Sequence, residues 1–331
     1  MGIPSVLIIS YMALNTELLL TLKQISGLGN KTILSIAQTI DADTIQDLCK
    51  QWIFRGNKRL ENIIPDDLME ANRIAKRIID VSQEQGIGIV SFFEDQFPDT
   101  LRECINEKGT LSPPLVLFYR GNINAMQLPG VAVIGTREPT PNGIKAGHYF
   151  ACEFARKGFN IVSGLAVGCD TAGHEGALMG NGVTTAFLAT SLDWNSIYPK
   201  QNLELAKRIV EHNGLLLSEY YIGQTLSKFA FVERDRLQAG LSSGTIVVQT
   251  GETGGTMHAV NATLKAGKPL MMVKYNLEED YNNEKTAGNN LFINQRRAHI
   301  LNSQNLNTCI ELVRTCSLNK PNNKQSYTLF D

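Results

Sequence analysis

The sequence predicts an α/β protein with an extended Rossmann-like, mainly parallel sheet and a small N-terminal helical domain. Two observations support this fold class. From residue 130 to about 314, short apolar runs alternate with helical patterns, and such alternation is typical of a parallel sheet covered by helices on both faces. Before that, residues 15–85 show only the apolar spacing of helices.

Shifts in composition divide the chain into four segments. We predict an N-terminal helical domain at 1–85, a connector with short strands at 86–126, a Rossmann-like domain at 127–316 and a polar C-terminal tail at 317–331. The connector strands are expected at 87–92 and 115–119, between clusters of proline and glycine. The apolar run at 3–9 lacks a basic flank and is too short to span a bilayer. We therefore expect a cytoplasmic protein with no membrane partner.

Two glycines interrupt the helical pattern of the first domain. The segment Ser26-Gly27-Leu28-Gly29-Asn30-Lys31-Thr32 separates two apolar stripes, which is typical of a helix-hairpin-helix. In that motif the backbone N–H groups of the hairpin hold a nucleic-acid phosphate without reading its sequence. Gly27, Gly29 and Lys31 are thus candidates for a secondary DNA contact. A plain corner between two helices explains the same residues.

The segment from Val131 to Asp170 has the pattern of a βαβ unit, with strand, glycine turn, helix, strand and second glycine turn. Both turns fall at the carboxyl ends of neighbouring parallel strands, where open α/β sheets place ligands. Gly135 and Gly164 would let a phosphate approach the backbone, and Arg137 would add a cation with bidentate reach. The spacing matches neither the dinucleotide fingerprint nor a P-loop. Tight turns without a ligand explain these glycines equally well.

Further strands are predicted at 131–135, 160–163, 183–189, 214–218, 245–250 and 269–274. Polar groups gather where these strands end, and a second glycine turn, Thr253-Gly254-Gly255-Thr256, precedes a helix there. Arg234 and Arg236 lie next to Phe229 and Phe231, and basic residues interleaved with aromatics suit single-stranded nucleic acid. Incidental arginines on a loop-to-helix surface are the alternative.

Charge and cysteine content exclude several classes of protein. The net charge of -1 means that any nucleic-acid binding has to come from a local basic patch. The six cysteines include no C-x-x-C pair, which favours reduced core thiols over disulfides or zinc, and neither zinc spacing of histidines nor an acidic magnesium cluster occurs. Cys169 and His174 lie near each other, but no third residue that would orient a catalytic dyad is evident. We expect no metal, no cofactor and no catalytic residue.

Taken together, the motifs resemble the DNA-processing protein A family (DprA, also called Smf) over nearly the whole chain. The V-G-S/T-R-x-P-T-x-x-G motif corresponds to residues 133–143, S-G-L-A-x-G-I-D to 163–170, and H-x-x-A-L to 174–178. The Y-P-x-x-N element corresponds to 198–202, S-E to 218–219, and F-x-x-R-N-R to 231–236. In the connector, Asp95, Phe97-Pro98, Pro113-Pro114 and Gly121 match the family pattern.

The resemblance implies a non-catalytic protein that binds and protects single-stranded DNA and helps to load a RecA-type recombinase, acting as a homodimer. By position, Arg137, Gly164, Lys200, Arg234 and Arg236 would line the single-strand groove. With the glycine turns, the predicted phosphate site comprises Gly135, Thr136, Arg137, Ser163, Gly164, Lys200, Arg234, Arg236, Gly254, Gly255 and Thr256. Natural transformation, plasmid maintenance and phage defence all remain open as the setting.

The chain departs from the family pattern at two points near this site. Asp235 replaces the asparagine of R-N-R, and the S-G-S-L-x-T-A element becomes residues 253–259. The Gly254-Gly255-Thr256 turn is also similar to the P-G-G-x-G-T-x-x-E turn of LOG-type nucleoside-monophosphate hydrolases, without its glutamate. Nucleotide binding or hydrolysis is therefore the alternative function. A terminal Leu329-Phe330 after Gln325 is faintly similar to sliding-clamp peptides, although a frayed end explains it as well.

Overall fold

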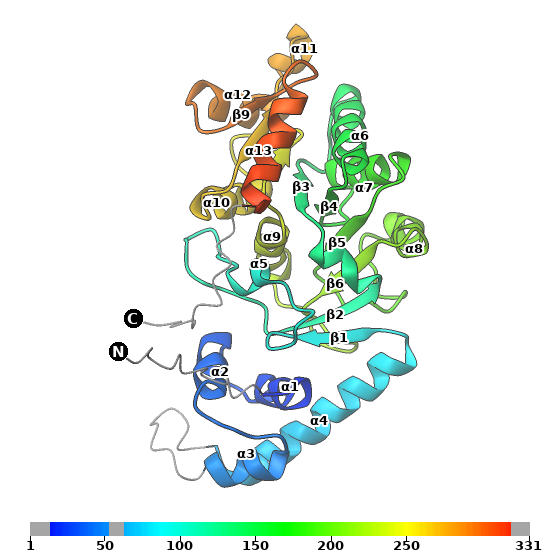
Figure 1. Ribbon diagram of the computed structural model, residues 1–331. Helices are drawn as coiled ribbons and strands as arrows, with labels where there is room; N and C mark the ends of the chain where they lie inside the picture. The colour runs from blue at the N-terminus through cyan, green and yellow to red at the C-terminus, as the bar shows by residue number, and fades with distance from the viewer. Residues whose placement is uncertain (1–13, 53–62, 319–331) are drawn as a thin grey trace, which may run out of the picture. The chain divides into compact units, whose positions relative to one another are not determined.

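The computed structural model describes residues 14–52 and 63–318. The chain divides into two compact units, one up to Lys76 and the other from Arg77 to Leu318. Helix α4 (Pro65–Glu84) contributes residues to both units (Figure 1). Each unit has its own buried apolar residues and is described separately below.

The first unit is helical, as predicted. Its helices are α1 (Thr16–Gln24), α2 (Asn30–Ala37), α3 (Ile45–Trp52) and the beginning of α4. Asn15 caps α1 by accepting a hydrogen bond from the Leu18 N–H at 3.0 Å. Leu19 and Ile33 are fully buried in the core. The buried Asn72 side chain donates to Glu17 Oε1 and Thr21 Oγ1, which ties α4 to α1.

The second unit is built on one nine-stranded sheet with the order β1-β2-β6-β5-β4-β3-β7-β8-β9. Strands β3 to β9 run parallel, whereas β1 and β2 are antiparallel additions at one edge. The strands are β1 (Gly88–Ser91), β2 (Val116–Gly121), β3 (Gly130–Ile134), β4 (Asn160–Ser163), β5 (Thr184–Leu188), β6 (Leu215–Ser218), β7 (Thr245–Val247), β8 (Leu270–Val273) and β9 (His299–Leu301).

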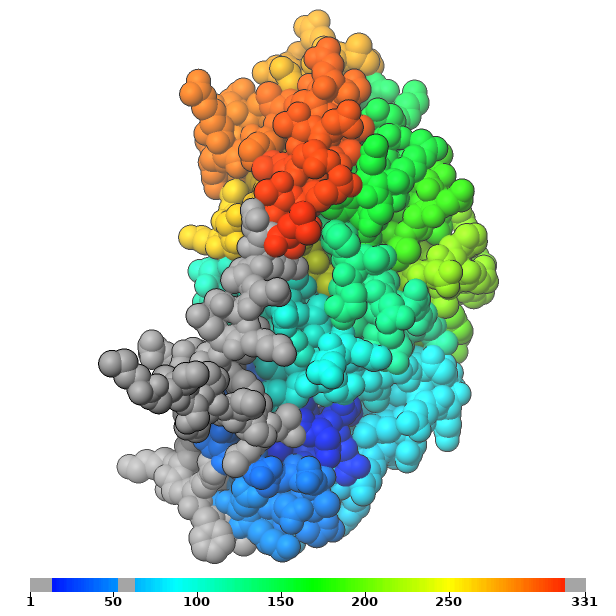
Figure 2. Space-filling model, viewed as in Figure 1, coloured from blue at the N-terminus to red at the C-terminus, as the bar shows by residue number. Residues whose placement is uncertain are grey.

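Helices cover both faces of this sheet (Figure 1). The longer ones are α6 (Pro141–Arg156), α7 (Cys169–Met179), α8 (Leu203–Glu211), α9 (Ala230–Leu241), α10 (Thr256–Lys265), α12 (Ala287–Asn294) and α13 (Leu306–Leu318). The shorter ones are α5 (Asp99–Arg102), α11 (Glu278–Tyr281), η1 (Ile123–Gln127), η2 (Lys200–Asn202) and η3 (Glu284–Thr286). In the space-filling view, α13 and the segment from α6 to α8 form much of the visible surface of this unit (Figure 2).

Alternate residues of β3 point into two different apolar cores. Val131 and Val133 pack with Phe154 of α6 and Val313 of α13 on one face. Ala132 and Ile134 pack on the other face with residues of α10 and α12. Because both faces of a parallel strand are buried, every residue of β3 is apolar or glycine.

The predicted Rossmann-like, mainly parallel sheet with an N-terminal helical region is confirmed, with three differences in detail. The segment predicted as a connector supplies β1 and β2, and β2 pairs with β6, so it extends the main sheet. The strand predicted at 245–250 ends at Val247. Strand β9, which pairs with β8, was not predicted. Among the described residues, no helix is both long and apolar enough to cross a membrane.

The buried side chain of Asn289 ties β7 and β8 together at their carboxyl ends. Its Nδ2 donates to the backbone carbonyls of Val247, Val248 and Val273 at 3.2, 2.9 and 3.1 Å, and its Oδ1 accepts the Thr250 N–H at 2.9 Å. Asn289 thereby fixes the start of the turn after β7, where the cavity described below lies.

We expect Asn289→Leu to lower the free energy of unfolding by about 2–4 kcal/mol, because it leaves several buried backbone groups without partners. Urea denaturation measures this change. The matched control is Asn290→Leu, which removes one exposed hydrogen bond to the Tyr281 carbonyl and should change stability much less. Equal effects of the two substitutions would contradict the role given to Asn289.

Candidate nucleic-acid interface

The sheet has a topological switch point between β3 and β7. Consecutive strands run outward from β3 through β4, β5 and β6 on one side and from β7 through β8 and β9 on the other. Doubly wound sheets bind ligands in the crevice outside the carboxyl ends of the strands at such a point. A cavity of about 520 Å³ lies there, within the range of about 300–1,000 Å³ that is common for ligand sites.

Four segments line this cavity, and three of them contain the predicted glycine turns. The turn after β3 contributes residues 134–138, and the segment after β4 contributes Ala166 and Asp170. The segment from the end of β7 into α10 contributes Thr250, Gly251, residues 253–256 and Ala259, and α9 contributes one face. From α9 come Phe231, Val232, Arg234, Asp235 and Gln238. The sequence therefore indicated all three turns, but it missed Gln238, which lies one helical turn after Arg234.

The glycines of the predicted phosphate site have different roles. A Cβ at Gly135 would lie 2.6 Å from Cys169 Sγ, and a Cβ at Gly164 would overlap the Arg234 guanidinium. Protein atoms thus fill the Cβ side of both glycines, while Gly135 also lines the larger cavity and Gly164 a smaller one beside it. Gly254 and Gly255 are exposed, and apart from the adjoining residues no atom in the described part of the chain lies within 4 Å of a Cβ built there.

The start of α10 opens onto the cavity. Its N-cap residue Gly255 supplies no side-chain hydrogen bond, and Thr256 lines the cavity. In contrast, Thr140 caps α6 through its Oγ1, which accepts the Gly143 N–H at 3.1 Å. A helix N-terminus carries partial positive charge and unpaired N–H groups, so the start of α10 is suited to an anion.

Two aromatic rings, the exposed Tyr198 and the half-buried Phe231, lie beside the predicted cation Arg137. The exposed Arg137 guanidinium lies 5.7 Å from the centroid of the Phe231 ring, and Phe231 meets the Tyr198 ring edge-on at 5.7 Å. A second, smaller cavity of about 40 Å³ lies between these residues, Gly164 and Arg234. Tyr198 is 51% exposed, so its ring is available to a flat ligand such as a nucleobase.

Arg234 is buried between two carboxylates. Its Nη1 donates to the Phe187 carbonyl at 3.1 Å, and its Nε lies 3.2 Å from Asp235 Oδ1. Asp170 also interacts with Arg234 and accepts hydrogen bonds from the N–H groups of Gly164 and Ala166. Burial raises the pKa of Asp170 above its ordinary value, although the Arg234 charge lowers it in part.

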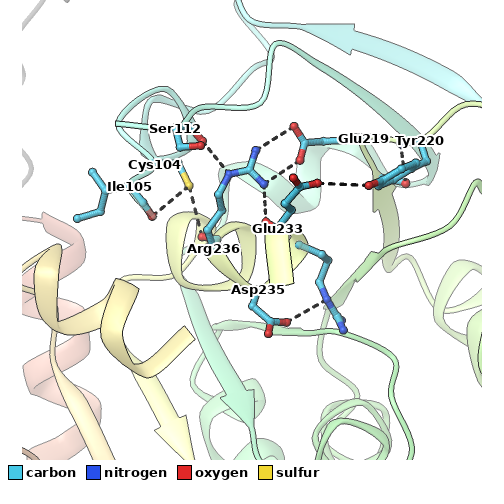
Figure 3. A network of polar contacts seen from close by, with 10 residues as sticks. Cys104, Ile105, Ser112, Glu219, Tyr220, Glu233, Asp235 and Arg236 are labelled. Atoms are coloured by element: carbon cyan, nitrogen blue, oxygen red, sulfur yellow. Dashed lines mark hydrogen bonds and ion pairs between the residues drawn. The ribbon is translucent and has the colours of Figure 1, made fainter. Parts of the chain in front are cut away.

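Arg236 does not face this cavity, and its predicted place in the groove needs correction. Its guanidinium makes a bidentate ion pair with Glu219 at 2.8 and 2.9 Å, and its Nε donates to the Ser112 carbonyl. Figure 3 shows Arg236 and Asp235 on opposite sides of α9. Although burial alone lowers the pKa of Arg236, Glu219 raises it overall. The Arg236 charge is therefore balanced inside the protein.

The other predicted site residues lie as follows. Ser163 is fully buried, and its Oγ donates to the Val133 carbonyl at 2.6 Å, so it joins β3 to β4. Lys200 is exposed in η2, lines neither cavity, and donates to the Asn195 carbonyl. Thr136 lines the larger cavity, and its N–H donates to the Gln249 carbonyl.

In the first unit, Gly27 has a φ of +86° and Gly29 precedes α2. Among residues 14–52 and 63–318, and apart from the adjoining residues, no atom lies within 4 Å of a Cβ built at either position. Lys31 is exposed in the first turn of α2. Leu329 and Phe330, the predicted sliding-clamp contact, lie outside the described residues. Within residues 14–52 and 63–318, no cluster of three or more acidic, histidine or cysteine side chains is arranged to hold a metal ion.

Asp235 gives the cavity a charge that changes near neutral pH. Burial raises the pKa of Asp235 to about 6, against the lowering effect of Arg234, and Asp170, His258 and Arg137 are the other charged groups that act on it. The carboxylate is therefore ionised above pH 6 and neutral below it. We expect a bound polyanion to be repelled less at pH 5.5 than at pH 7.5.

Affinity for a thymidine oligomer should therefore rise several-fold between pH 7.5 and pH 5.5 at constant ionic strength, as fluorescence anisotropy would measure. In Asp235→Asn most of this pH dependence should disappear, because the side chain no longer titrates. An unchanged pH profile in that variant would assign the effect to other groups.

Comparison with known proteins agrees with this architecture. The model of the family described as DNA recombination-mediator protein A matches residues 88–313. The DNA processing protein DprA of Bacillus subtilis is 33% identical over 206 residues, which are 62% of this chain and 66% of that protein. Protein Smf of Synechocystis is 40% identical over 150 residues, 44% of this chain and 37% of that protein. The chain thus matches about a third to two thirds of the length of these relatives.

Two solved structures are similar as well. The X-ray structure of DprA from Streptococcus pneumoniae has a TM-score of 0.68 at 26% identity, covering 90% of this chain and 98% of that one. DNA processing protein A from Helicobacter pylori, described with a unique single-stranded DNA binding mode, has a TM-score of 0.56 at 30% identity. The match covers 68% of this chain and 96% of that one. Since the family model spans more than half of the sequence, the chain belongs to the DNA recombination-mediator protein A family.

Proposed function

We propose that this protein binds single-stranded DNA along the carboxyl edge of the sheet and mediates recombination on it. The observation that supports this most is the arrangement at the switch point. An open helix N-terminus and the exposed Arg137 lie at one cavity, and the exposed Tyr198 ring and the half-buried Phe231 ring lie beside it. Phosphates and bases of an unpaired strand need these two kinds of surface side by side.

Each part of a strand then has a proposed contact. Backbone phosphates would bind the start of α10 at Gly254, Gly255 and Thr256, with Arg137 as the neighbouring cation. Bases would stack on Tyr198 and Phe231, and Phe229, which is 55% exposed, extends this aromatic surface. Lys200, exposed two residues after Tyr198, would contact the phosphate backbone as it leaves the site. We leave Arg236 out of the contact set because its charge is already paired.

Membership of the DNA recombination-mediator protein A family supports the proposed role in recombination. A protein of this family with a single-stranded DNA site would protect incoming or processed strands and help a RecA-type recombinase to assemble on them. We propose that it works as a homodimer in the cytoplasm, where such strands are used. The hairpin at Gly27, Gly29 and Lys31 is proposed as a secondary contact to the DNA backbone.

A titration of labelled oligonucleotides tests this proposal. Oligo-dT should bind more tightly than a duplex of equal length, and the affinity should fall steeply with salt, because phosphate contacts release counterions. Equal affinity for the two forms, or binding that is insensitive to salt, would contradict a single-strand site made of cations and aromatic rings.

A second candidate, hydrolysis of nucleoside monophosphates, is favoured by one observation. The turn after β7 lacks the glutamate of the hydrolases, but the Asp235 carboxyl lines the same cavity. Burial raises the pKa of Asp235 to about 6, which is in the range useful for acid–base catalysis. Incubation with nucleoside monophosphates would release free base if this function is correct. Release that is lost in Asp235→Asn would rank hydrolysis above DNA binding.

A further inference from the structure

The inner face of α9 presents hydrogen-bond acceptors to the larger cavity. Asp235 and Gln238 both line it, and the Gln238 Nε2 donates to Asp235 Oδ1 at 3.0 Å. Gln238 is 2% exposed, and its Oε1 has no hydrogen-bond partner among the described residues. An ionised carboxylate can only accept hydrogen bonds, and one of the two N–H donors of the Gln238 amide is already bonded to the Asp235 carboxylate.

These acceptors do not suit a phosphate in the depth of the cavity. A phosphate there would meet the carboxylates of Asp235 and Asp170, and the charge of the nearest cation, Arg234, is already shared with both. The anion-binding features, Arg137 and the start of α10, belong to the exposed turns at the rim. The interior therefore fits a neutral group that donates hydrogen bonds, attached to an anion that stays outside.

We propose that the cavity holds a guanine base, whose N1–H and 2-amino group donate together to the Asp235 carboxylate. This inference deepens the proposed function by giving the single-strand site one base-selective pocket. The same base could arrive in a DNA strand or in a free mononucleotide, and the experiment below separates these sources. Phe231, Val232 and Ile134 supply apolar wall for the faces of the ring.

The pattern of donors on each base explains the choice. Guanine has two adjacent donors on its Watson–Crick edge, which match the two oxygens of a carboxylate. Thymine has a single N–H between two carbonyl oxygens, and these oxygens would face the carboxylate unfavourably. Adenine and cytosine each have one amino group next to a ring-nitrogen acceptor. A neutral asparagine at 235 would present a donor as well as an acceptor, so the preference depends on the aspartate of this chain.

Competition among short oligonucleotides tests the inference. A thymidine oligomer with one central guanine should bind about 10-fold more tightly than the all-thymine oligomer, because a good bidentate contact to a base gives discrimination of about that size. The same oligomer with hypoxanthine, which lacks only the 2-amino group, should lose most of this gain. Oligomers with one adenine or one cytosine should resemble oligo-dT.

Two variants assign the preference to Asp235. In Asp235→Asn, which keeps the size of the side chain, the guanine and hypoxanthine oligomers should bind with nearly equal affinity. The matched control is Glu252→Gln, which removes an exposed carboxylate that does not line the cavity. It should leave the ratio of guanine to thymine affinity unchanged.

The outcomes separate this inference from the proposed function. If oligo-dT binds and neither a single guanine in the oligomer nor dGMP is preferred, the guanine pocket is wrong and the single-strand site stands. If no oligomer binds but dGMP binds the wild type more tightly than dTMP and loses that preference in Asp235→Asn, the pocket is supported with a free nucleotide as its ligand, and the proposed function is wrong. If no oligomer binds and dGMP is not preferred over dTMP, both the guanine pocket and the proposed function are wrong.

Discussion

Replacing Arg234 by alanine is expected to lower the free energy of unfolding by about 3–5 kcal/mol, because it leaves buried carboxylates without their cation. Asp170 is 6% exposed and lies against Gly164, and Asp235 contacts the Arg234 Nε. Both depend on the guanidinium for charge balance. Urea denaturation at pH 7.5 measures the loss.

The pH dependence of this variant gives a more specific test. Without Arg234 the pKa values of Asp170 and Asp235 should rise further, and an acid with a raised folded-state pKa destabilises the protein as pH increases through that value. Arg234→Ala should therefore regain part of its stability when the pH is lowered from 7.5 to about 5. Arg156→Ala, which removes a surface ion pair with Glu153, should cost little at either pH. A deficit of Arg234→Ala that is the same at both pH values would contradict the charge-balance explanation.

Replacing Arg137 by alanine is expected to weaken binding of oligo-dT by about 10–100-fold at low salt, because a charge-assisted hydrogen bond to phosphate contributes a binding free energy of that size. The side chain is exposed and packs on Phe231, so its loss should leave the fold intact. The slope of log K against log salt concentration should also fall by about 1, since one phosphate contact is lost. Anisotropy titrations at several salt concentrations measure both quantities.

Arg236→Ala is the informative comparison for Arg137→Ala. Because Arg236 is paired with Glu219, its removal should lower stability while leaving the salt slope of DNA binding unchanged. A salt slope that falls in Arg236→Ala and not in Arg137→Ala would reverse our placement of the groove.

Much of the fold was predictable because a buried parallel strand is marked by a continuous apolar run between glycine turns. Strand β4 coincides with its predicted range, and β3 and β5 differ by one residue at their ends. The three-residue strand β9 was missed because its sequence, His-Ile-Leu, contains only two apolar residues and follows a polar loop. Edge strands of this length are defined by pairing with a neighbour, here β8.

The candidate site was predicted in its location but not in the direction of its side chains. Residues two apart on a helix point to different sides, so Arg234 and Arg236 could not both face one cavity once α9 formed there. Gly135 and Gly164 could not be separated from Gly254 and Gly255 by sequence, because the difference lies in which distant atoms fill the space of a Cβ. For the same reason the burial of Gln238 was not foreseen.

We propose that an unpaired strand binds at the switch point between β3 and β7. A crystal structure of the protein with a short single-stranded oligonucleotide tests it most directly. We predict a phosphate within hydrogen-bond distance of Gly255 or Thr256 at the start of α10, with Arg137 beside it and a base against Phe231. A strand bound elsewhere, with this cavity empty, would contradict the account.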